Sequence, residues 1–397
     1  MSDVVLVLNS GSSSLKYSLV DASNGRSIAG GQVERIGESD GRVKHYGPNG
    51  ETRRELDVAS HEDALRAVLD SFASRGPSLD DTDLAAIGHR VVHGGDRFAE
   101  PTLVDDALVD AVTDLVPLAP LHNPANLEGI EVARRLFPDL PQVAVFDTAF
   151  HQSLPEHAYT YAVPLSWKQE YRVRRYGFHG SSHAFVSAEA ARLLGRAPEE
   201  VNVIVLHLGN GCSATAVRKG RSVDTSMGMT PLEGLVMGTR SGDVDPAVHA
   251  HLAREAGWSL EEIDNALNRE SGLKAMTGDN DFRELERRLE AGDQRARLAF
   301  DVYCYRIRKY VGAYAFALGA VDAIVFTAGV GERSPLVRAR VLGGLESLGI
   351  HLDLARNDAA SREARVISAE DSPVVVMMIP TNEEWEIARQ ALAVVRR

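Results

Sequence analysis

One structural unit occurs twice in this chain: an apolar strand enters a tight turn rich in Gly, Ser and Asn, and a second strand leaves it. The first copy is VVLVLNSGSSSLKYSLV, from Val4 to Val20, and the second is VNVIVLHLGNGCSATAV, from Val201 to Val217. Such a turn points several backbone N–H groups into one small concavity, where glycine lets a phosphate oxygen approach closely. A copy in each half of the chain predicts a nucleotide held between two related domains.

Length and charge restrict the classes of partner. At about 150 residues per domain, the 397 residues predict two or three domains. The balance of 43 Lys+Arg against 56 Asp+Glu gives a net charge of −13, which argues against nucleic acid or an anionic membrane as the main partner. Small anionic ligands remain possible, because clustered arginines outweigh the global charge locally.

The remaining compositional signals point to a reducing environment. Cys212 and Cys304 are far apart and outside any CxxC spacing, so neither a disulfide framework nor a zinc site is expected. The chain starts with a strand pattern instead of a basic segment and a long apolar one, so we expect no signal peptide. The longest apolar run, VVVMMI before Pro380, is too short to span a bilayer. We expect a cytoplasmic protein.

Strand patterns alternate with helix patterns in both halves, which favours an α/β layered fold with a cleft between two lobes. We expect domains at 1–150 and 151–383, the first completed by the C-terminal helix at about 384–397. Strands are expected at 3–20 as a hairpin, in 84–95, 142–151, 201–217, 322–332 and 374–379, and an exposed β-ribbon or loop at 37–55. Helices are expected at 61–76, 123–138, 298–319 and from Ser334 onward.

Three glycine turns are candidate nucleotide contacts. The turn from Asn9 to Ser14, followed by Lys16, offers N–H groups, hydroxyls and an ammonium, although a plain surface hairpin would have a similar composition. The turn from Leu208 to Gly211 matches it in the second half. A third, AGVGE from Ala328 to Glu332, separates a buried strand from a helix and would let a ring or ribose lie against the backbone. It fits neither the Walker nor the GxGxxG pattern, so a tight strand–helix connection is the alternative.

Arginine and histidine in glycine-flanked positions suggest an anion site. Arg90 stands at a strand end, and Arg240 and His179 lie in loops, in MGTRSGD and YGFHGSSH. Loop arginines often bind carboxylate or phosphate bidentately, the alternative being a surface salt bridge. His93 and His122 are equally compatible with purely structural roles.

Acidic residues follow two apolar strands. Asp147 comes directly after VAVF, where catalytic acids commonly sit and where a helix cap is the alternative. Glu383 and Glu384 follow Thr381-Asn382. One of the two would reach a magnesium ion through an oxygen, and the other would serve as an acid in the first turn of a helix.

Together these motifs identify a family. NSGSSSLK, GHRVVHGG, PLHNP, FDTAFH, YGFHGSSH, HLGNG, TPLEGLVMGTRSGD, FTAGVGE and PTNEE, in this order and over nearly the whole chain, resemble the acetokinase family. The resemblance implies two duplicated ribonuclease-H-like domains, of the actin-like ATPase type, with the active site in the cleft between them. It also implies reversible in-line transfer of a phosphoryl group from ATP to acetate, giving ADP and acetyl phosphate, with Mg²⁺ or Mn²⁺, in a homodimer.

The resemblance also implies roles for matching residues. The metal residues are Asn9 and Glu383, and Lys16 is an ATP contact. Arg90 contacts the substrate carboxylate, Asp147 occupies the catalytic acid/base position, and His179 and Arg240 stabilise the transition state. The substrate methyl group is expected among Val92, Leu121, Phe178 and Pro231. The nucleotide is expected at His207, Leu208, Gly209, Asn210 and Gly211, at Asp281, Phe282 and Arg283, and at Gly329, Val330, Gly331, Glu332 and Arg333.

Arg333 and Asp147 qualify what the resemblance implies. Arg333 stands where the family is expected to carry Asn more often, which leaves the preference between ATP and GTP undecided. Because a carboxylate substrate is already ionised at neutral pH, we expect Asp147 to orient an arginine or a metal-bound water instead of acting as a base.

Other functions are compatible with part of the pattern. A kinase of propionate or butyrate is the nearest alternative, since one methylene in an apolar pocket is worth only about 1–3 kcal/mol. An actin- or chaperone-like ATPase switch is the distant one, and it has no need for Arg90, His179 and Arg240.

Overall fold

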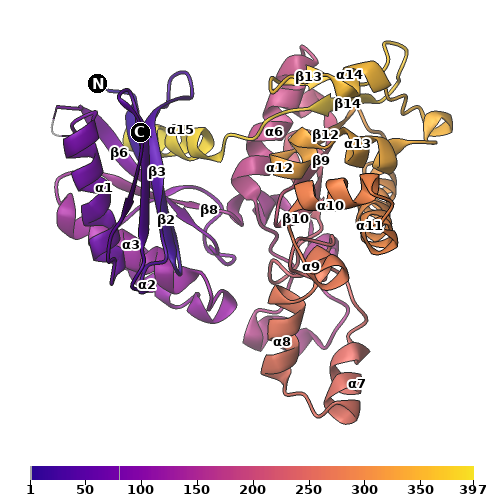
Figure 1. Ribbon diagram of the computed structural model, residues 1–397, viewed down its shortest axis with the longest axis horizontal. Helices are drawn as coiled ribbons and strands as arrows, with labels where there is room; N and C mark the ends of the chain where they lie inside the picture. The colour runs from indigo at the N-terminus through magenta and orange to yellow at the C-terminus, as the bar shows by residue number, and fades with distance from the viewer. Residues whose placement is uncertain (1, 80) are drawn as a thin grey trace. The chain divides into compact units, whose positions relative to one another are not determined.

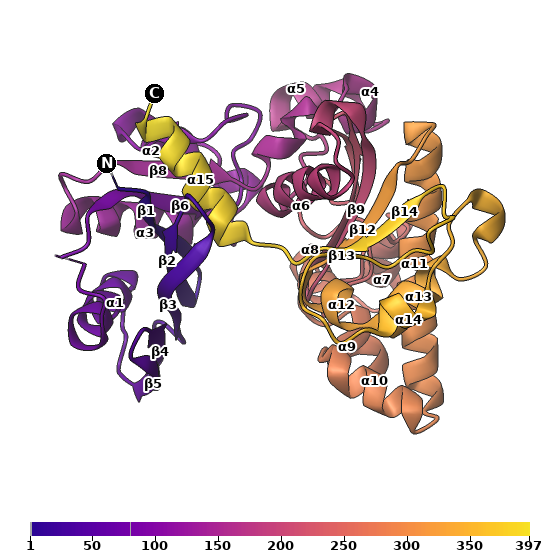
Figure 2. The ribbon, with the colours of Figure 1, turned by 90° about the horizontal axis from the view of Figure 1, so that it is seen from above.

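The structure is a computed structural model that describes residues 2–79 and 81–397. The chain divides into two compact units (Figures 1 and 2). Unit 1 comprises the chain up to Gln152 together with Asn382–Arg397, and unit 2 is Ser153–Thr381. The boundaries therefore fall at 152 and 381, where the sequence suggested 150 and 383.

Unit 1 is an eight-stranded sheet with helices on both faces. Its strands are β1 (Val4–Gly11), β2 (Ser14–Asp21), β3 (Arg26–Glu34), β4 (Arg42–Gly47), β5 (Gly50–Glu55), β6 (Leu84–Val91), β7 (Thr102–Leu103) and β8 (Gln142–Phe146). Its helices are α1 (His61–Arg75), α2 (Asp106–Thr113), α3 (Asn123–Leu136) and α15 (Glu383–Val395).

Unit 2 is built around a six-stranded sheet. Its strands are β9 (Asn202–Leu208), β10 (Cys212–Arg218), β11 (Arg221–Thr225), β12 (Ala323–Thr327), β13 (Arg365–Val366) and β14 (Val375–Met378). Its helices are α4 (Glu156–Tyr159), α5 (Leu165–Tyr171), α6 (Gly180–Leu193), α7 (Ala247–Glu255), α8 (Leu260–Arg269), α9 (Gly272–Thr277), α10 (Phe282–Glu290), α11 (Gln294–Leu318), α12 (Ala328–Arg333), α13 (Pro335–Leu342) and α14 (Leu354–Asp358).

The two sheets share one core topology, which confirms the predicted duplication. Unit 1 contains the order β3-β2-β1-β6-β8, and unit 2 contains β11-β10-β9-β12-β14. In each, the first three strands pair antiparallel and the next two join in parallel. The two glycine turns of the sequence are the β1–β2 and β9–β10 connections.

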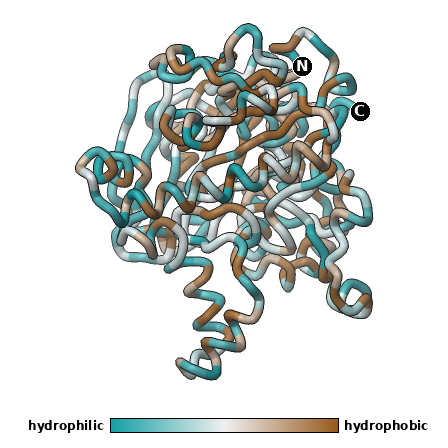
Figure 3. The backbone as a smooth tube through the Cα atoms, turned by 90° about the vertical axis from the view of Figure 1, so that its right-hand side faces the viewer, coloured by the Kyte–Doolittle hydropathy of each residue, from teal (hydrophilic) through white to brown (hydrophobic). Residues whose placement is uncertain are grey.

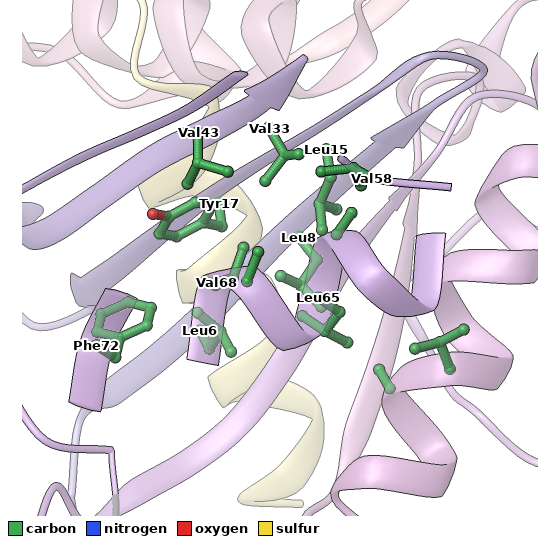
Figure 4. Packing of buried hydrophobic residues seen from close by; sticks show 14 of the residues in the cluster. Leu6, Leu8, Leu15, Tyr17, Val33, Val43, Val58, Leu65, Val68 and Phe72 are labelled. Atoms are coloured by element: carbon green, nitrogen blue, oxygen red, sulfur yellow. The ribbon is translucent and has the colours of Figure 1, made fainter. Parts of the chain in front are cut away.

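The central strands of unit 1 are buried on both faces, as expected for strands sandwiched between helices. Alternate residues of β1 point to opposite sides, because side chains alternate along a strand. Leu6 and Leu8 join a cluster with Leu65, Val68 and Phe72 of α1 (Figure 4). On the other face, residues of β1 and β8 pack against α15; these are Val5, Val7, Val143 and Val145, with Ile387, Ala388, Ala391 and Leu392.

One predicted turn is wrong. AGVGE was expected to be a turn between a strand and a helix, but Ala328–Arg333 forms the helix α12 directly after β12. Ala328 adopts a left-handed backbone with φ 63°, a conformation that costs a non-glycine residue energy. The left-handed conformation of Ala328 turns the chain, so that a helix starts without a connecting loop. A second helix, α13, follows with Ser334 as its N-cap.

Hydrophobic and hydrophilic residues are interspersed along the backbone (Figure 3). Within residues 2–79 and 81–397, no helix combines the length and the apolar character needed to cross a membrane.

Candidate active site

In unit 1, the predicted residues gather at the carboxyl ends of β1, β6 and β8, where ligands bind in open α/β sheets. Asn9 lies near the end of β1, Arg90 near the end of β6, and Asp147 directly after β8. A cavity of about 220 Å³ is lined by Asn9, Arg90, Lys16 of β2 and Glu383, the first residue of α15. Residues from both ends of the chain thus line one cavity.

Arg90 and Asp147 form a bidentate pair. Arg90 Nε donates to Asp147 Oδ1 at 2.9 Å, and Nη2 donates to Oδ2 at 2.7 Å. The Asp147 side chain is 4% exposed and that of Arg90 21%. Burial lowers the pKa of Arg90, but the carboxylates of Asp147 and Glu383 outweigh it and hold that pKa above its ordinary value. The guanidinium is therefore a fixed, oriented cation.

Glu383 and Asn9 fit a magnesium site. Burial raises the pKa of Glu383, the charge of Arg90 opposes this, and that of Asp147 adds to it. A nearby divalent cation would relieve this cost of burying a carboxylate. No group of three His, Cys, Asp or Glu suited to a metal occurs among the described residues. Mg²⁺ does not require one, since it usually keeps several waters and takes one or two carboxylates plus phosphate oxygens.

Asn126 of α3 holds two parts of this edge together, and the sequence reasoning missed it. Its Nδ2 donates to the carbonyl of Ser10 at 2.6 Å, and its Oδ1 accepts from the N–H of Val92 at 3.0 Å. Close packing of α3 depends on Gly129, because a Cβ there would lie 2.1 Å from Ser10 Oγ. The only available signal was the amide-rich HNPAN segment that opens the helix.

His61 supports the same turn from α1. Its Nε2 lies 2.8 Å from the carbonyl oxygen of Gly11, and its Nδ1 lies 3.0 Å from Glu128 Oε2. The β1–β2 turn is therefore held from two helices, an arrangement that an ordinary surface hairpin does not need.

In unit 2, His179 is held from two sides. It adopts a left-handed backbone, φ 59°, as the N-cap of α6. Its ring stacks on that of His207, with centroids 4.1 Å apart. Its Nδ1 lies 2.9 Å from Ser213 Oγ, and the same hydroxyl lies 2.7 Å from His183 Nε2. The imidazole orientation is set by these neighbours.

Arg240 lies beside His179 and the LGNG turn. A Cβ on Gly211 would be 3.4 Å from Arg240 Nη1 and 3.6 Å from the His179 ring. Arg240 Nη1 donates to the carbonyl of Pro231 at 3.3 Å, and burial lowers the pKa of the guanidinium. In the part of the chain that the structure describes, Arg240 forms no ion pair with a carboxylate. A largely buried cation without an anion beside it suits an anionic ligand.

The three segments predicted to hold the nucleotide line one cavity of about 540 Å³ in unit 2. It contains Gly209 and Asn210, then Asp281, Phe282 and Arg283, and then Gly329, Val330 and Arg333. Sequence reasoning missed five further lining residues: Gly238, Leu273, Asn280, Glu286 and Ser334. Asn280 Nδ2 donates to Asn210 Oδ1 at 2.9 Å, which fixes the tip of the LGNG turn.

Asp281 also has a structural task. It caps α10 by accepting from the N–H of Arg283 at 2.9 Å. The Arg283 side chain is the main cause that lowers the pKa of Asp281 to about 2.

The predicted methyl pocket is only partly apparent within each unit. Phe178 is buried, at 2%, whereas Leu121 is 52% exposed. Val92 and Pro231 are half-buried. These four positions remain predictions.

Comparison with known proteins decides the family. The model of the acetokinase family matches residues 4–389. The chain belongs to the acetokinase family. Acetokinase-family relatives named acetate kinase include that of Streptomyces avermitilis, 58% identical over 98% of this chain and 97% of the relative. That of Clavibacter michiganensis is also 58% identical, over 98% of each chain.

Solved structures agree with this assignment. The acetate kinase of Porphyromonas gingivalis superposes with a TM-score of 0.95 at 43% identity, covering 98% of this chain and 99% of that one. A propionate kinase from Francisella tularensis gives 0.92 at 41% identity, with the same coverage. An acetokinase fold of two duplicated actin-like ATPase domains is therefore established for this chain.

Proposed function

We propose that this protein is an acetate kinase, which transfers the γ-phosphoryl group of ATP reversibly to acetate in a Mg²⁺-dependent reaction. The observation that carries the proposal is the oriented Arg90 guanidinium, locked by Asp147 and lying in a cavity with Asn9, Lys16 and Glu383. Family membership over residues 4–389 supports it.

The residues divide by task. Arg90 binds the acetate carboxylate, and Asp147 orients Arg90. The cavity that contains Gly209, Asp281 and Gly329 holds ATP. Because the transition state of phosphoryl transfer is loose and spreads charge over the equatorial oxygens, the protein contributes mainly position and charge neutralisation.

Arg240 and His179 neutralise the negative charge of the phosphoryl group in the transition state. Both lie beside Gly211, so they reach the phosphate end of a nucleotide bound at the LGNG turn. Asn9 and Glu383 would hold Mg²⁺, which would neutralise phosphate charge when bound.

A propionate kinase is the second candidate, because a protein of that name superposes at a TM-score of 0.92. We propose acetate as the better substrate, since the relatives near 58% identity are named acetate kinase and bulky Phe178 favours the smaller acid. The proposed phosphoryl donor is ATP. Because Arg333 lines the nucleotide cavity in place of the expected Asn, GTP is compared with ATP in the test below.

Hydroxylamine trapping tests the proposal. The purified protein is incubated with MgATP and acetate, propionate or butyrate, then with MgGTP, and the acyl hydroxamate is measured. We expect acetate with ATP to give the highest kcat/KM. Release of ADP without a carboxylate would contradict the proposal and favour an ATPase switch.

We also propose that the enzyme is a cytoplasmic homodimer. Light scattering coupled to gel filtration measures the mass, and a monomer of 43.0 kDa would contradict the dimer. Fractionation of cells tests the location.

A further inference from the structure

Unit 2 contains an ion pair to which the proposed function assigns no role. Arg175 Nη2 donates to Glu233 Oε1 at 2.6 Å, with the side chains 15% and 33% exposed. Arg175 lies on the segment that leads into Phe178 and His179, and Glu233 follows Pro231 in the loop that continues to Arg240. The pair therefore ties together two segments that carry proposed site residues.

Arg175 also fixes where this loop begins. Its Nη1 donates to three consecutive carbonyl groups, those of Thr225, Ser226 and Met227, at 2.9, 3.1 and 3.1 Å. These are the last residue of β11 and the two that follow it. A guanidinium shared between three carbonyls and a carboxylate leaves the chain little freedom at this point.

Tyr161 completes the arrangement. Its hydroxyl donates to Glu233 Oε2 and accepts from the N–H of Met229 at 3.0 Å. Gly228 lies against both groups, because a Cβ there would be 1.7 Å from Glu233 Oε2 and 2.3 Å from the Tyr161 oxygen. The carbonyl of Gly228 accepts from the N–H of Tyr176 at 3.0 Å. Both carboxylate oxygens of Glu233 are thus bound, and the loop packs tightly around them.

The loop that contains Glu233 connects this network to Arg240. Pro231 and Glu233 are separated by one residue, and the carbonyl of Pro231 accepts from Arg240 Nη1 at 3.3 Å. The N–H of Gly234 donates to Asp243 Oδ1 at 2.8 Å, and this bond joins the two ends of the loop segment that contains Arg240. The Arg240 guanidinium, which has no carboxylate partner in the described residues, takes its position from this loop.

We propose that Arg175, Glu233 and Tyr161 are positioning residues that set the place of Arg240 for phosphoryl transfer. The inference rests on the proposed function. A displacement of about 1 Å in a reacting group costs on the order of 10²-fold in rate. Arg175, Glu233 and Tyr161 therefore affect kcat although none of them needs to touch the substrates.

Glu233→Gln tests this, because glutamine keeps the shape and removes the charge. We expect kcat to fall by roughly 10-fold or more, with the KM for ATP within about twofold of the parent, since the nucleotide cavity is lined by other residues. Glu189→Gln is the matched control. It neutralises the Glu189–Arg192 pair, 2.9 Å long with Glu189 23% exposed, and should leave kcat unchanged.

Tyr161→Phe provides a second route that does not depend on the folding of the first variant. It removes only the hydroxyl that bridges Glu233 and Met229, and we expect kcat to fall in the same direction. In the double variant the losses should be clearly less than additive, because both changes act through one network.

Thermal unfolding separates positioning from stability. A lower Tm with kcat within twofold of the parent in both variants would overturn the proposal. A parent enzyme that forms no acetyl phosphate would instead contradict the proposed function, so the two failures are distinguishable.

Discussion

At the scale of single residues, the pairing of Asp147 with Arg90 supports the orienting role that the sequence predicts for Asp147. Both oxygens of Asp147 accept from the guanidinium, and its side chain is 4% exposed. A general base needs a free lone pair directed at a proton of the substrate. Acetate is ionised at neutral pH and has no such proton to give up. The geometry favours an orienting role.

Asp147→Asn should therefore lower kcat without removing a limb of the pH–rate profile. The amide still accepts one hydrogen bond from Arg90 but no longer holds it bidentately, and we expect a loss on the order of 10²-fold. Kinetics across the pH range measure this. Asp301→Asn, in the exposed pair with Arg340 at 2.8 Å, is the control. A lost limb would restore the base role.

Arg240→Ala should lower kcat by on the order of 10³-fold, because an arginine that neutralises transition-state charge contributes at this scale. The KM for acetate should change only modestly. Arg340→Ala removes an exposed arginine, 57% accessible, and serves as the control. A large rise in KM at unchanged kcat would assign Arg240 to ground-state binding.

Glu383→Gln should make the metal-free protein more stable and should lower the activity measured with Mg²⁺. Burial raises the pKa of Glu383 above its ordinary 4.5, so the stability linked to its proton is complete below pH 4.5 and is lost as the pH rises through the higher folded-state pKa. At pH 7 the ionised group therefore lowers the free energy of unfolding.

Calorimetry at pH 7 and pH 4 measures this effect. We expect the Tm of Glu383→Gln to exceed that of the parent at pH 7 and the difference to shrink at pH 4. Glu384→Gln, at the exposed neighbouring position, should show no such pattern. Mg²⁺ with ADP should stabilise the parent more than Glu383→Gln, and equal stabilisation would argue against a metal role.

At the scale of elements, helix α3 organises the strand ends of unit 1. Asn126 connects a carbonyl near the end of β1 with the N–H that follows β6, so two proposed site segments share one amide. The predicted helix at 123–138 was correct, but its inward-facing polar residue was not recognised.

Asn126→Asp should weaken this link, because a carboxylate cannot donate to the Ser10 carbonyl. We expect a loss of about 1–3 kcal/mol in the free energy of unfolding together with a lower kcat. Urea titration and steady-state kinetics check both. Asn24→Asp, which removes the exposed bond to Asp21 at 2.8 Å, should have little effect. An unchanged kcat would limit Asn126 to a structural role.

At the scale of the whole molecule, the chain returns to unit 1 at its end. Helix α15 packs Ile387 and Leu392 against Val5 and Val143. The helix lies close to the sheet, since a Cβ on Gly88 would be 2.9 Å from Ile387. Unit 1 therefore needs residues 382–397 in addition to the N-terminal segment that ends at Gln152.

Ile387→Ala should destabilise the protein by about 2–5 kcal/mol, the usual cost of removing a buried Ile side chain. Deleting 382–397 should leave unit 1 unfolded, because burial of Ile387 and Leu392 alone contributes about 3–6 kcal/mol. Hydrogen exchange resolved by segment checks this. Leu56→Ala, at an exposed position of unit 1, is the control, and native protection of unit 1 in the truncated chain would contradict the prediction.

Local patterns in the sequence were sufficient for the two hairpins, for helices α1, α3, α11, α13 and α15, for the acids at strand ends and for the family motifs. Alternation, helical spacing and turn chemistry act between neighbours in the chain. The sequence alone was insufficient for the helical form of Ala328–Arg333, for the Arg90–Asp147 pair, or for the supports from Asn126, Glu233 and Tyr161. Each of these depends on groups that are distant in sequence and meet only when the sheets and helices pack. The tertiary structure therefore decided which charges are paired and which, like Arg240, have no carboxylate partner among the described residues.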